Sequence, residues 1–517
     1  MSNRLSKIFN VLYIYIFFNL VLCTFIFASS KNDTTTSIDY NRAFKSEIGN
    51  TILAQVGEKK ITVREFLASY EFGPAFTKRE KNSKSRYLKY MIDEKLLALD
   101  GYKKGFADSA RVKNLLSAIK GDLSTDQLFN ADIFDKIKIS QPEINKALKE
   151  KKFTYRVKWL YAPNKDSLYY YLSHLNSGFS FDSLFDMQLK DSVYADQRSM
   201  KVNKFNLRMQ NLDMFKTVDT LKAGEISKPI HGSDGWYIVK LIDVWKDAIV
   251  TQSKLNKEED DAVKALKLNQ SDSLSDVYVK KIMLEHNPVI QGRAFDILRS
   301  YMGDFVLPKK KFLAWKLEER MQKELNHFDT LTKSEFPKLK LIDLNDGSLS
   351  LDDFLKWYKM RDEYLKFDKT DFNSFSASLE KLIWQMVRDH LLIRRAYSRG
   401  FQNKEIIKQQ LNWWKDKIVY AVVRDNLAKT VKLNIESPSS LKSKYNNKKQ
   451  ILIEKTYRKL QQLRKEYKVK INEEVLSELR VHDYDDPRTI DTYIVKKGGI
   501  FPHPAYPSID FSWQAWE

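Results

Sequence analysis

Residues that commonly perform covalent or metal-assisted chemistry are few and scattered in this chain of 517 residues. The single cysteine, Cys23, lies in an apolar N-terminal stretch, so no thiol is left once that stretch is removed. No phosphate-binding glycine loop and no nucleophile elbow is present. No two of the seven histidines stand at metal-ligand spacing, and we predict no metal, no cofactor and no assignable catalytic residue. The histidines are His174, His231, His286, His327, His390, His482 and His503.

Residues 153–248 have the pattern of a small α+β domain. A strand is predicted at 154–162, where apolar and polar residues alternate before an apolar end, and a helix at 165–175. Two later strands are predicted at 200–207 and 236–244. A strand, helices and late strands within about 95 residues indicate one compact domain.

Three motifs in this region resemble the parvulin (PpiC-type) prolyl isomerases. GEISKPI at 224–230 and GWYIVKL at 235–241 are similar to the C-terminal signature of that family. GFSFDSL at 178–184 resembles its Gly-x-x-Phe-x-x-Leu segment, and 156–162 takes the place of its first strand. The resemblance implies a parvulin-like domain, with peptidyl-prolyl cis-trans isomerisation as the family activity.

The residues that would support this activity are changed. Active parvulins usually carry one histidine on the first strand and one on the last, and the matching positions here are Trp159 and Tyr237. Prolyl isomerisation needs no nucleophile, because its barrier of roughly 18–20 kcal/mol is that of rotation about the amide bond. Without the imidazole pair we expect weak or absent activity. An active isomerase whose pocket tolerates Trp159 and Tyr237 is the alternative.

The resemblance also implies a substrate-binding pocket in this domain. Its expected residues are Trp159, Met209, Phe215 and Tyr237. The register between the strands is open, so Gln210 could stand in place of Met209, and Met214 in place of Phe215.

An internal repeat flanks the domain. MIDEKLLALDGYKKGF at 91–106 aligns without a gap to MVRDHLLIRRAYSRGF at 386–401. Six residues are shared, whereas random pairing would give roughly one. Gly105 and Gly400, near the two ends, fit the left-handed residue that closes a helix.

The repeat extends upstream, where ITVREFL at 61–67 parallels LSLDDFL at 349–355. In both copies a Thr or Ser is followed three residues later by an acid, which predicts a capped helix start. Helices are also expected at 109–130 and 404–429. These helical regions resemble the N-terminal region of SurA-like periplasmic chaperones, which implies that they bind polypeptides.

The N-terminus predicts export. Arg4 and Lys7 precede an apolar run at 11–28, and small residues follow it. A cleaved signal peptide is favoured over an uncleaved membrane anchor, and both place the body in the periplasm. The net charge of +21 is therefore read as a lysine-rich solvated surface, with contact to a membrane surface left open and nucleic acid excluded as a partner.

The aromatic residues cluster at four places, where they could grip client chains or pack in cores. The clusters are Tyr169-Tyr170-Tyr171, Trp357-Tyr358, Trp413-Trp414 and 511–516. Residues 442–470 form a strongly basic segment with apolar residues at near-helical spacing, which predicts a solvated helix.

The predicted fold class is a multidomain α+β protein, with mainly helical chaperone-like modules on either side of one small parvulin-like domain. The predicted segments are a signal peptide or anchor (1–30), a linker (31–50), a helical module (51–152), the parvulin-like domain (153–248), a helical connector (249–340), a second helical module (341–480) and a tail (481–517).

The expected function is that of a periplasmic chaperone. It would bind unfolded or nascent exported polypeptides, including outer-membrane proteins, through apolar grooves that accept many sequences. The alternatives are an active prolyl isomerase and a structural subunit of an outer-membrane assembly or secretion machine.

Overall fold

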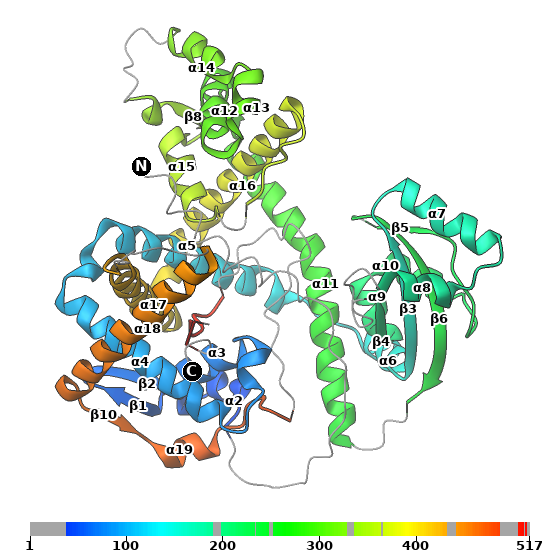
Figure 1. Ribbon diagram of the computed structural model, residues 1–517, viewed down its shortest axis with the longest axis horizontal. Helices are drawn as coiled ribbons and strands as arrows, with labels where there is room; N and C mark the ends of the chain where they lie inside the picture. Colours follow the sequence, from blue (N-terminus) through cyan, green and yellow to red (C-terminus); the bar gives the residue numbers. More distant parts are fainter. Residues whose placement is uncertain are drawn as a thin grey trace. The chain divides into compact units, whose positions relative to one another are not determined.

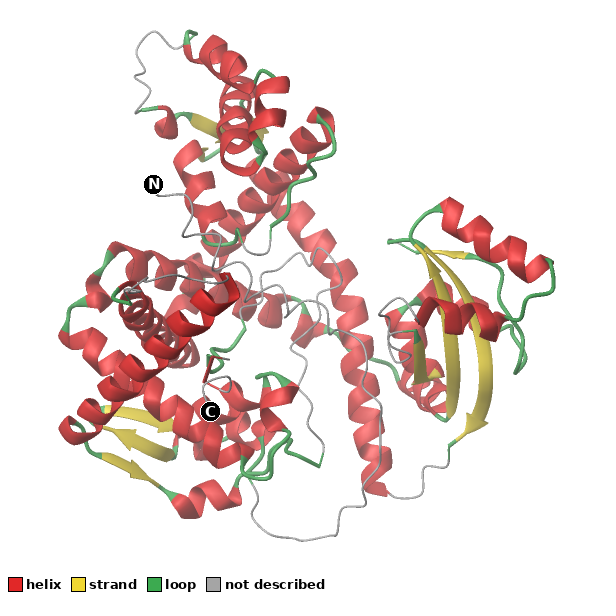
Figure 2. Ribbon diagram, viewed as in Figure 1, coloured by secondary structure: helices red, strands yellow, loops and turns green. Residues whose placement is uncertain are grey.

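The computed structural model describes residues 38–189, 198–232, 234–247, 252–327, 335–362, 365–431, 441–485, 505–510 and 512–513. The signal peptide or anchor predicted at 1–30 lies outside them. Helices dominate and are accompanied by three small sheets (Figure 2), which confirms the mainly helical, multidomain α+β fold class. The described residues divide into two compact units, one within 137–271 and the other made of 38–136 with 272–513. In the part of the chain that the structure describes, no helix has the length and apolarity needed to cross a membrane.

The first unit is built on a four-stranded antiparallel sheet of order β4-β3-β6-β5 (Figure 1). The sheet consists of β3 (Phe153–Ala162), β4 (Ser199–Asn203), β5 (Ile230–His231) and β6 (Trp236–Lys246). The strand predicted at 200–207 ends early, because the Asn203 side chain accepts a hydrogen bond from the backbone N–H of Asn206 and caps a helix there.

Successive side chains of a strand point to opposite faces, so both faces of this sheet carry apolar residues. Helices cover each face. Leu160 and Ile238 pack under one helical pair, and Trp159 and Val239 under the other. The first pair is α7 (Lys165–Asn176) and α8 (Phe181–Leu189). The second pair is α9 (Lys204–Gln210) and α10 (Leu212–Val218).

Two further helices complete the first unit, α6 (Gln141–Lys151) and the first part of α11 (Gln252–His286). Ala147 of α6, Phe205 of α9 and Ala262 of α11 form one apolar cluster. An ion pair of 2.7 Å between Lys151 Nζ and Glu258 Oε2 also links α6 to α11. From Asp272 onward, α11 belongs to the second unit.

The second unit contains both copies of the repeat, and each begins with a β-hairpin followed by a capped helix. The Thr62 side chain accepts from the Glu65 N–H, and Ser350 with Asp353 forms a capping box. The elements of the first copy are β1 (Ile52–Val56), β2 (Lys59–Thr62), α3 (Val63–Glu71), α4 (Ser83–Lys103) and α5 (Ala110–Asp132). Those of the second are β8 (Lys340–Leu344), β9 (Gly347–Ser350), α15 (Leu351–Lys359), α16 (Phe372–Ser398) and α17 (Glu405–Lys429).

The predicted helix ends are confirmed in both copies. Gly105 has φ of 71° and Gly400 has φ of 73°, which is the left-handed conformation that favours glycine. A single 3-10 turn follows each glycine. These turns are η4 (Phe106–Asp108) and η8 (Phe401–Asn403), and the remaining short helical elements are α2 (Tyr40–Lys45), η2 (Glu47–Asn50), η3 (Ala75–Lys78), η5 (Phe134–Lys136) and η7 (Phe336–Lys338).

Each hairpin gains a third, antiparallel strand from elsewhere in the chain. β10 (Val469–Ile471) pairs with β1, and β7 (Val289–Ile290) pairs with β8. The next residue then donates its backbone N–H to the hairpin, Asn472 to Leu53 O at 2.9 Å and Gln291 to Leu341 O at 2.8 Å. The repeat therefore extends to a helix, a strand and a helix that sequence comparison did not find.

The helices of these completing segments differ in length. The first copy is completed by α18 (Leu441–Glu466) and α19 (Glu473–Glu478), and the second by α11 and α12 (Gly292–Val306), with α13 (Lys309–Ala314) and α14 (Leu317–Leu325) after it. The basic segment predicted as a helix at 442–470 thus forms α18 and β10 and packs with the first copy. The boundaries of the modules at 51–152 and 341–480 stay predictions.

The two copies pack on one another reciprocally. α4 contacts α17, and α16, the counterpart of α4, contacts α5, the counterpart of α17. α5 and α17 also contact each other. The duplicated sequence therefore folds as an intertwined pair within one compact unit.

Candidate functional site

The structure brings three of the four predicted pocket residues together. Trp159, Phe215 and Tyr237 belong to one apolar cluster on the sheet face that α9 and α10 cover. Met209 packs instead in the cluster of α6, α9 and α11. Met214, the other residue of the open register, lies with Trp159 and is 4% exposed. Their role in substrate binding stays a prediction.

Trp159 is a core residue of this domain, because only 7% of its surface is exposed. Tyr161 and Tyr237 are among the residues of this face that solvent reaches, because both are only partly buried. These two residues are direct cross-strand partners on β3 and β6, and their ring centroids are 5.4 Å apart. Tyr161 was not singled out from the sequence, although it follows Trp159 by two residues and so shares its face.

The turn between β5 and β6 locks the two tyrosines in place. Asp234 accepts from the Tyr237 hydroxyl through Oδ1 at 2.8 Å and from the Tyr161 hydroxyl through its backbone oxygen at 2.6 Å. The turn can lie this close to β3 because residue 235 is Gly. A Cβ there would be 2.5 Å from the Ala162 carbonyl oxygen.

The hydroxyl of Tyr237 is a neutral hydrogen-bond donor. Burial and the Asp234 carboxylate both raise its pKa, so it stays protonated at neutral pH. The Arg198 guanidinium lies 5.0 Å from the Tyr161 ring centroid, which is within cation–π range. The site therefore offers aromatic faces edged by one cation, and these surfaces suit proline rings and aromatic side chains.

The domain's own histidines do not contribute to this site. The His174 ring contacts the Tyr170 carbonyl on α7, and the His231 ring lies 4.5 Å from that of Trp236. Both contacts involve residues outside the cluster around Trp159. Among the described residues there is also no group of His, Cys, Asp or Glu that could hold a metal ion. The described side chains of this face offer aromatic rings and one cation, and they include no imidazole pair.

A second apolar surface lies on α11 within the second unit. Leu274, Val277 and Leu284 are 47%, 67% and 71% exposed and lie along one side of the helix. Exposed apolar side chains that line up in this way are typical of surfaces that contact another polypeptide. From the sequence, this helix was predicted only as part of a connector.

The predicted aromatic clusters divide between core and surface. Tyr169 and Tyr170 on α7 are 62% and 45% exposed, as a gripping surface requires. Trp413 and Trp513 are 7% and 0% exposed and serve as core residues. Trp357 donates its indole N–H to Asp389 at 2.9 Å.

Comparison with known proteins gives matches among solved structures only. No protein-family model matches the chain, and no curated protein matches it. The chain resembles the peptidylprolyl isomerase PrsA of Bacillus cereus (13% identity, 55% of this chain and 95% of that one, TM-score 0.20). It also resembles the foldase protein PrsA of Streptococcus pneumoniae (13% identity, 42% and 86%, TM-score 0.20) and PrsA of Bacillus subtilis (13%, 55% and 95%, TM-score 0.17). Likenesses of this size carry no argument about activity, and the SurA-like character of the helical modules stays a prediction.

Proposed function

We propose that this protein is a periplasmic foldase-type chaperone that holds unfolded exported polypeptides, including outer-membrane proteins. Its parvulin-like domain would act mainly as a peptide-binding unit with weak or absent prolyl-isomerase activity. The observation that carries the proposal is the partly exposed Tyr161–Tyr237 pair, which lies over an apolar sheet face with Trp159 and Tyr237 at the positions of the family's histidines. An aromatic pair of this kind can stack on a client, whereas the imidazoles that support active parvulins have no counterpart here.

The apolar side of α11 supports the same function. Val277 and Leu284 would cover apolar client segments without demanding a particular sequence, because apolar contact is not directional. Lys280 and Lys281 beside them are exposed and suit acidic residues of the client. Export, as predicted from 1–30, would bring the protein to chains that have left the cytoplasm unfolded.

The first experiment measures client holding by the exported chain. An unfolded outer-membrane barrel is diluted with and without the protein, and aggregation is followed by light scattering. Tyr237→Ala and Leu284→Lys should each shorten the delay in aggregation several-fold. Met187→Ala is the matched control, because it removes an exposed apolar side chain of the same domain that lies on α8. Wild-type protein that causes no delay at all would refute the proposal.

The second experiment separates binding from catalysis. A protease-coupled assay on a prolyl peptide should give a rate close to the uncatalysed exchange, which takes about 10–100 s. Fast turnover that Tyr237→Ala abolishes would instead establish the active isomerase. Stoichiometric purification with one fixed partner, without any delay of aggregation, would favour the structural-subunit alternative.

A further inference from the structure

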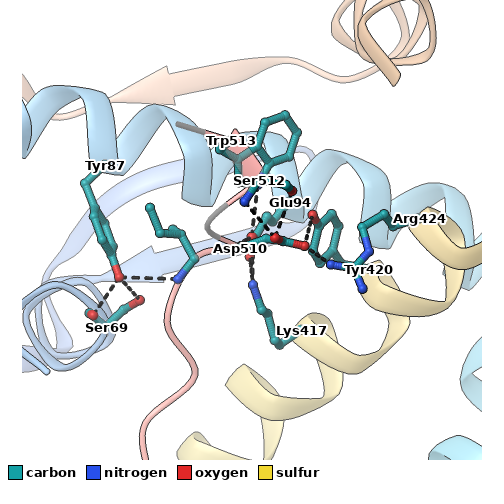
Figure 3. Close-up of polar contacts among 10 residues, drawn as sticks. Ser69, Tyr87, Glu94, Lys417, Tyr420, Arg424, Asp510, Ser512 and Trp513 are labelled. Atoms are coloured by element: carbon teal, nitrogen blue, oxygen red, sulfur yellow. Dashed lines mark hydrogen bonds and ion pairs between the residues drawn. The ribbon is translucent and has the colours of Figure 1, made fainter. Parts of the chain in front are cut away.

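A segment far from the first repeat copy in sequence lies in the apolar core of that copy. We name residues 505–510 and 512–513 the C-terminal strap. Ile509 and Trp513 are 3% and 0% exposed and belong to the apolar core of the second unit. Figure 3 shows the strap against side chains of the first copy and of α17, such as Glu94 and Lys417. The segment was predicted only as part of a tail at 481–517.

Aromatic rings hold the strap at two points. The Trp513 ring stacks on Tyr90 at 5.9 Å and on Tyr420 at 6.3 Å between centroids. Near the other end, the Tyr506 ring lies 4.9 Å from that of Phe72, and its hydroxyl is 3.3 Å from that of Tyr40. The strap is thus anchored by a ring at each end.

Side chains also capture the strap's backbone and its carboxylate (Figure 3). Glu94 accepts from the Asp510 N–H at 2.7 Å and from the Trp513 indole N–H at 3.1 Å. The Tyr87 hydroxyl accepts from the Ile509 N–H at 3.3 Å. The Asp510 carboxylate accepts from Tyr420 at 3.1 Å and pairs with Arg424.

This mode of attachment differs from that of β10, which joins the first copy through backbone pairing with β1. The strap is held by side chains that contact both its backbone and its side chains. That pattern is typical of peptide recognition in a groove, where a few buried anchors supply most of the affinity. We name the surface formed by Tyr87, Tyr90, Glu94, Tyr420 and Arg424 the strap groove.

In the second copy, the described residues that contact the centre of the corresponding helix pair include Trp357 and Arg361. There α16 and α5 meet as α4 and α17 do, and Asp389 and Asp122 stand where Glu94 and Lys417 stand. The Arg361 guanidinium contacts both carboxylates, at 2.7 Å to Asp122 and 3.5 Å to Asp389. The same helix pair can therefore pack with other side chains at its centre, so the repeat fold does not depend on the strap.

We propose that the strap groove is a peptide-binding site that the chain's own end occupies, and that segments of unfolded clients displace the strap. The preferred segment has an apolar residue, then an aspartate, then an aromatic residue three positions after the aspartate, as in Ile509, Asp510 and Trp513. The proposal rests on the proposed function and names a client class for a site outside the parvulin-like domain. Clients would bind here only when they outcompete a tethered segment, whose effective concentration is in the mM range for short linkers.

The test uses the full exported chain and a fluorescent synthetic peptide with the sequence of 505–513. Wild-type protein should bind the peptide weakly, because its own strap fills the groove. Trp513→Ala in the protein weakens that strap and should tighten peptide binding at least ten-fold. A control peptide carrying the Trp513→Ala change should lose binding to the same variant protein. Asp510→Ala in the protein is the second, milder variant.

Each outcome of this test either supports or overturns the proposal. A folded Trp513→Ala protein that binds the peptide no more tightly than wild type would overturn the proposal. If both variants lose their folded circular-dichroism spectrum, the strap is a fixed part of the core and the proposal is also wrong. The light-scattering assay on the same variants keeps the proposed function separate, because the Tyr161–Tyr237 face is unchanged in them.

Discussion

The two copies of the repeat meet through helix pairs of the same design but with different charges at their centres. Where α4 crosses α17, Glu94 pairs with Lys417 at 2.7 Å, and the strap lies over the pair. Where α16 crosses α5, the counterparts are Asp389 and Asp122, and Arg361 and Arg388 neutralise them. One junction is therefore a balanced ion pair, and the other is a carboxylate pair that depends on arginines.

A second difference concerns the residue one position further along α4 and α16. Lys95 lies between Glu65 and Asp416 at 2.6 Å from each, and all three side chains are under 10% exposed. Its counterpart is His390, whose pKa is lowered by burial. Duplication thus preserved the apolar residues and the helix ends, while the buried polar residues diverged. The buried polar groups, more than the shared fold, therefore distinguish the two junctions.

A substitution in the Lys95 cluster should have the largest effect on stability. Lys95→Met should cost about 3–5 kcal/mol of stability, because it leaves Glu65 and Asp416 buried with only Lys59 as a cation. His390→Met at the matching position should cost about 1 kcal/mol. Urea unfolding, monitored by hydrogen exchange in α4 and α16, measures the loss of stability for both variants.

A triple variant is the control for this prediction. Lys95→Met combined with Glu65→Gln and Asp416→Asn removes the uncompensated charges and should regain part of the loss. Equal costs for Lys95→Met and His390→Met would show that the buried ions do not distinguish the junctions.

The next effect concerns pH at the carboxylate junction. Burial raises the pKa of Asp122 to about 7, and the charge of Asp389 adds to this rise, although Arg361 opposes it. Since the unfolded value is about 3.9, the stability that Asp122 contributes is complete below pH 4 and is lost as pH rises to 7. Relative to Asp122→Asn, wild type should lose on the order of 3 kcal/mol between pH 4 and pH 8.

The difference between the two unfolding curves is the readout, because many other groups titrate in both proteins. Asp108→Asn is the matched control: this aspartate is 82% exposed, and its curve should run parallel to that of wild type. A constant difference between wild type and Asp122→Asn over this pH range would contradict the assignment.

Substitutions in the two helix caps should have the smallest effect on stability. In the first copy the acid after Thr62, Glu65, turns to Lys95, whereas in the second Asp353 reaches back to the Ser350 N–H at 2.8 Å. Thr62→Ala and Ser350→Ala should each cost about 1 kcal/mol, with Ser350→Ala the larger because its cap is reciprocal. Thr62→Ser and Ser350→Thr keep the hydroxyls and should be nearly neutral in thermal unfolding.

Local patterns predicted the repeat well. The caps at Thr62 and Ser350 and the glycines at 105 and 400 act within a few residues, so the sequence carries them directly. The strands at 154–162 and 236–244 were also found from alternation, and the error at 200–207 arose because the capping signal of Asn203 was not recognised.

Long-range features could not be found in this way. β7 and β10 span two and three residues, too few for any periodicity, and their partners are set by the tertiary fold. The same holds for the site. Its register was open between Met209 and Gln210 and between Met214 and Phe215. The Tyr161 hydrogen bond depends on Asp234, 73 residues away. The burial of Trp513 had no local signal beyond its aromatic ring.

The pairing of β1 with β10 sets an order of events for a chain that is delivered from its N-terminus. The first hairpin exists once residue 62 has emerged, but its third strand arrives only with residues 469–471. The second hairpin already has β7 behind it when β8 and β9 appear. The repeat that is made first must therefore be the one that is finished last, and until then its sheet edge is open to any other passing strand.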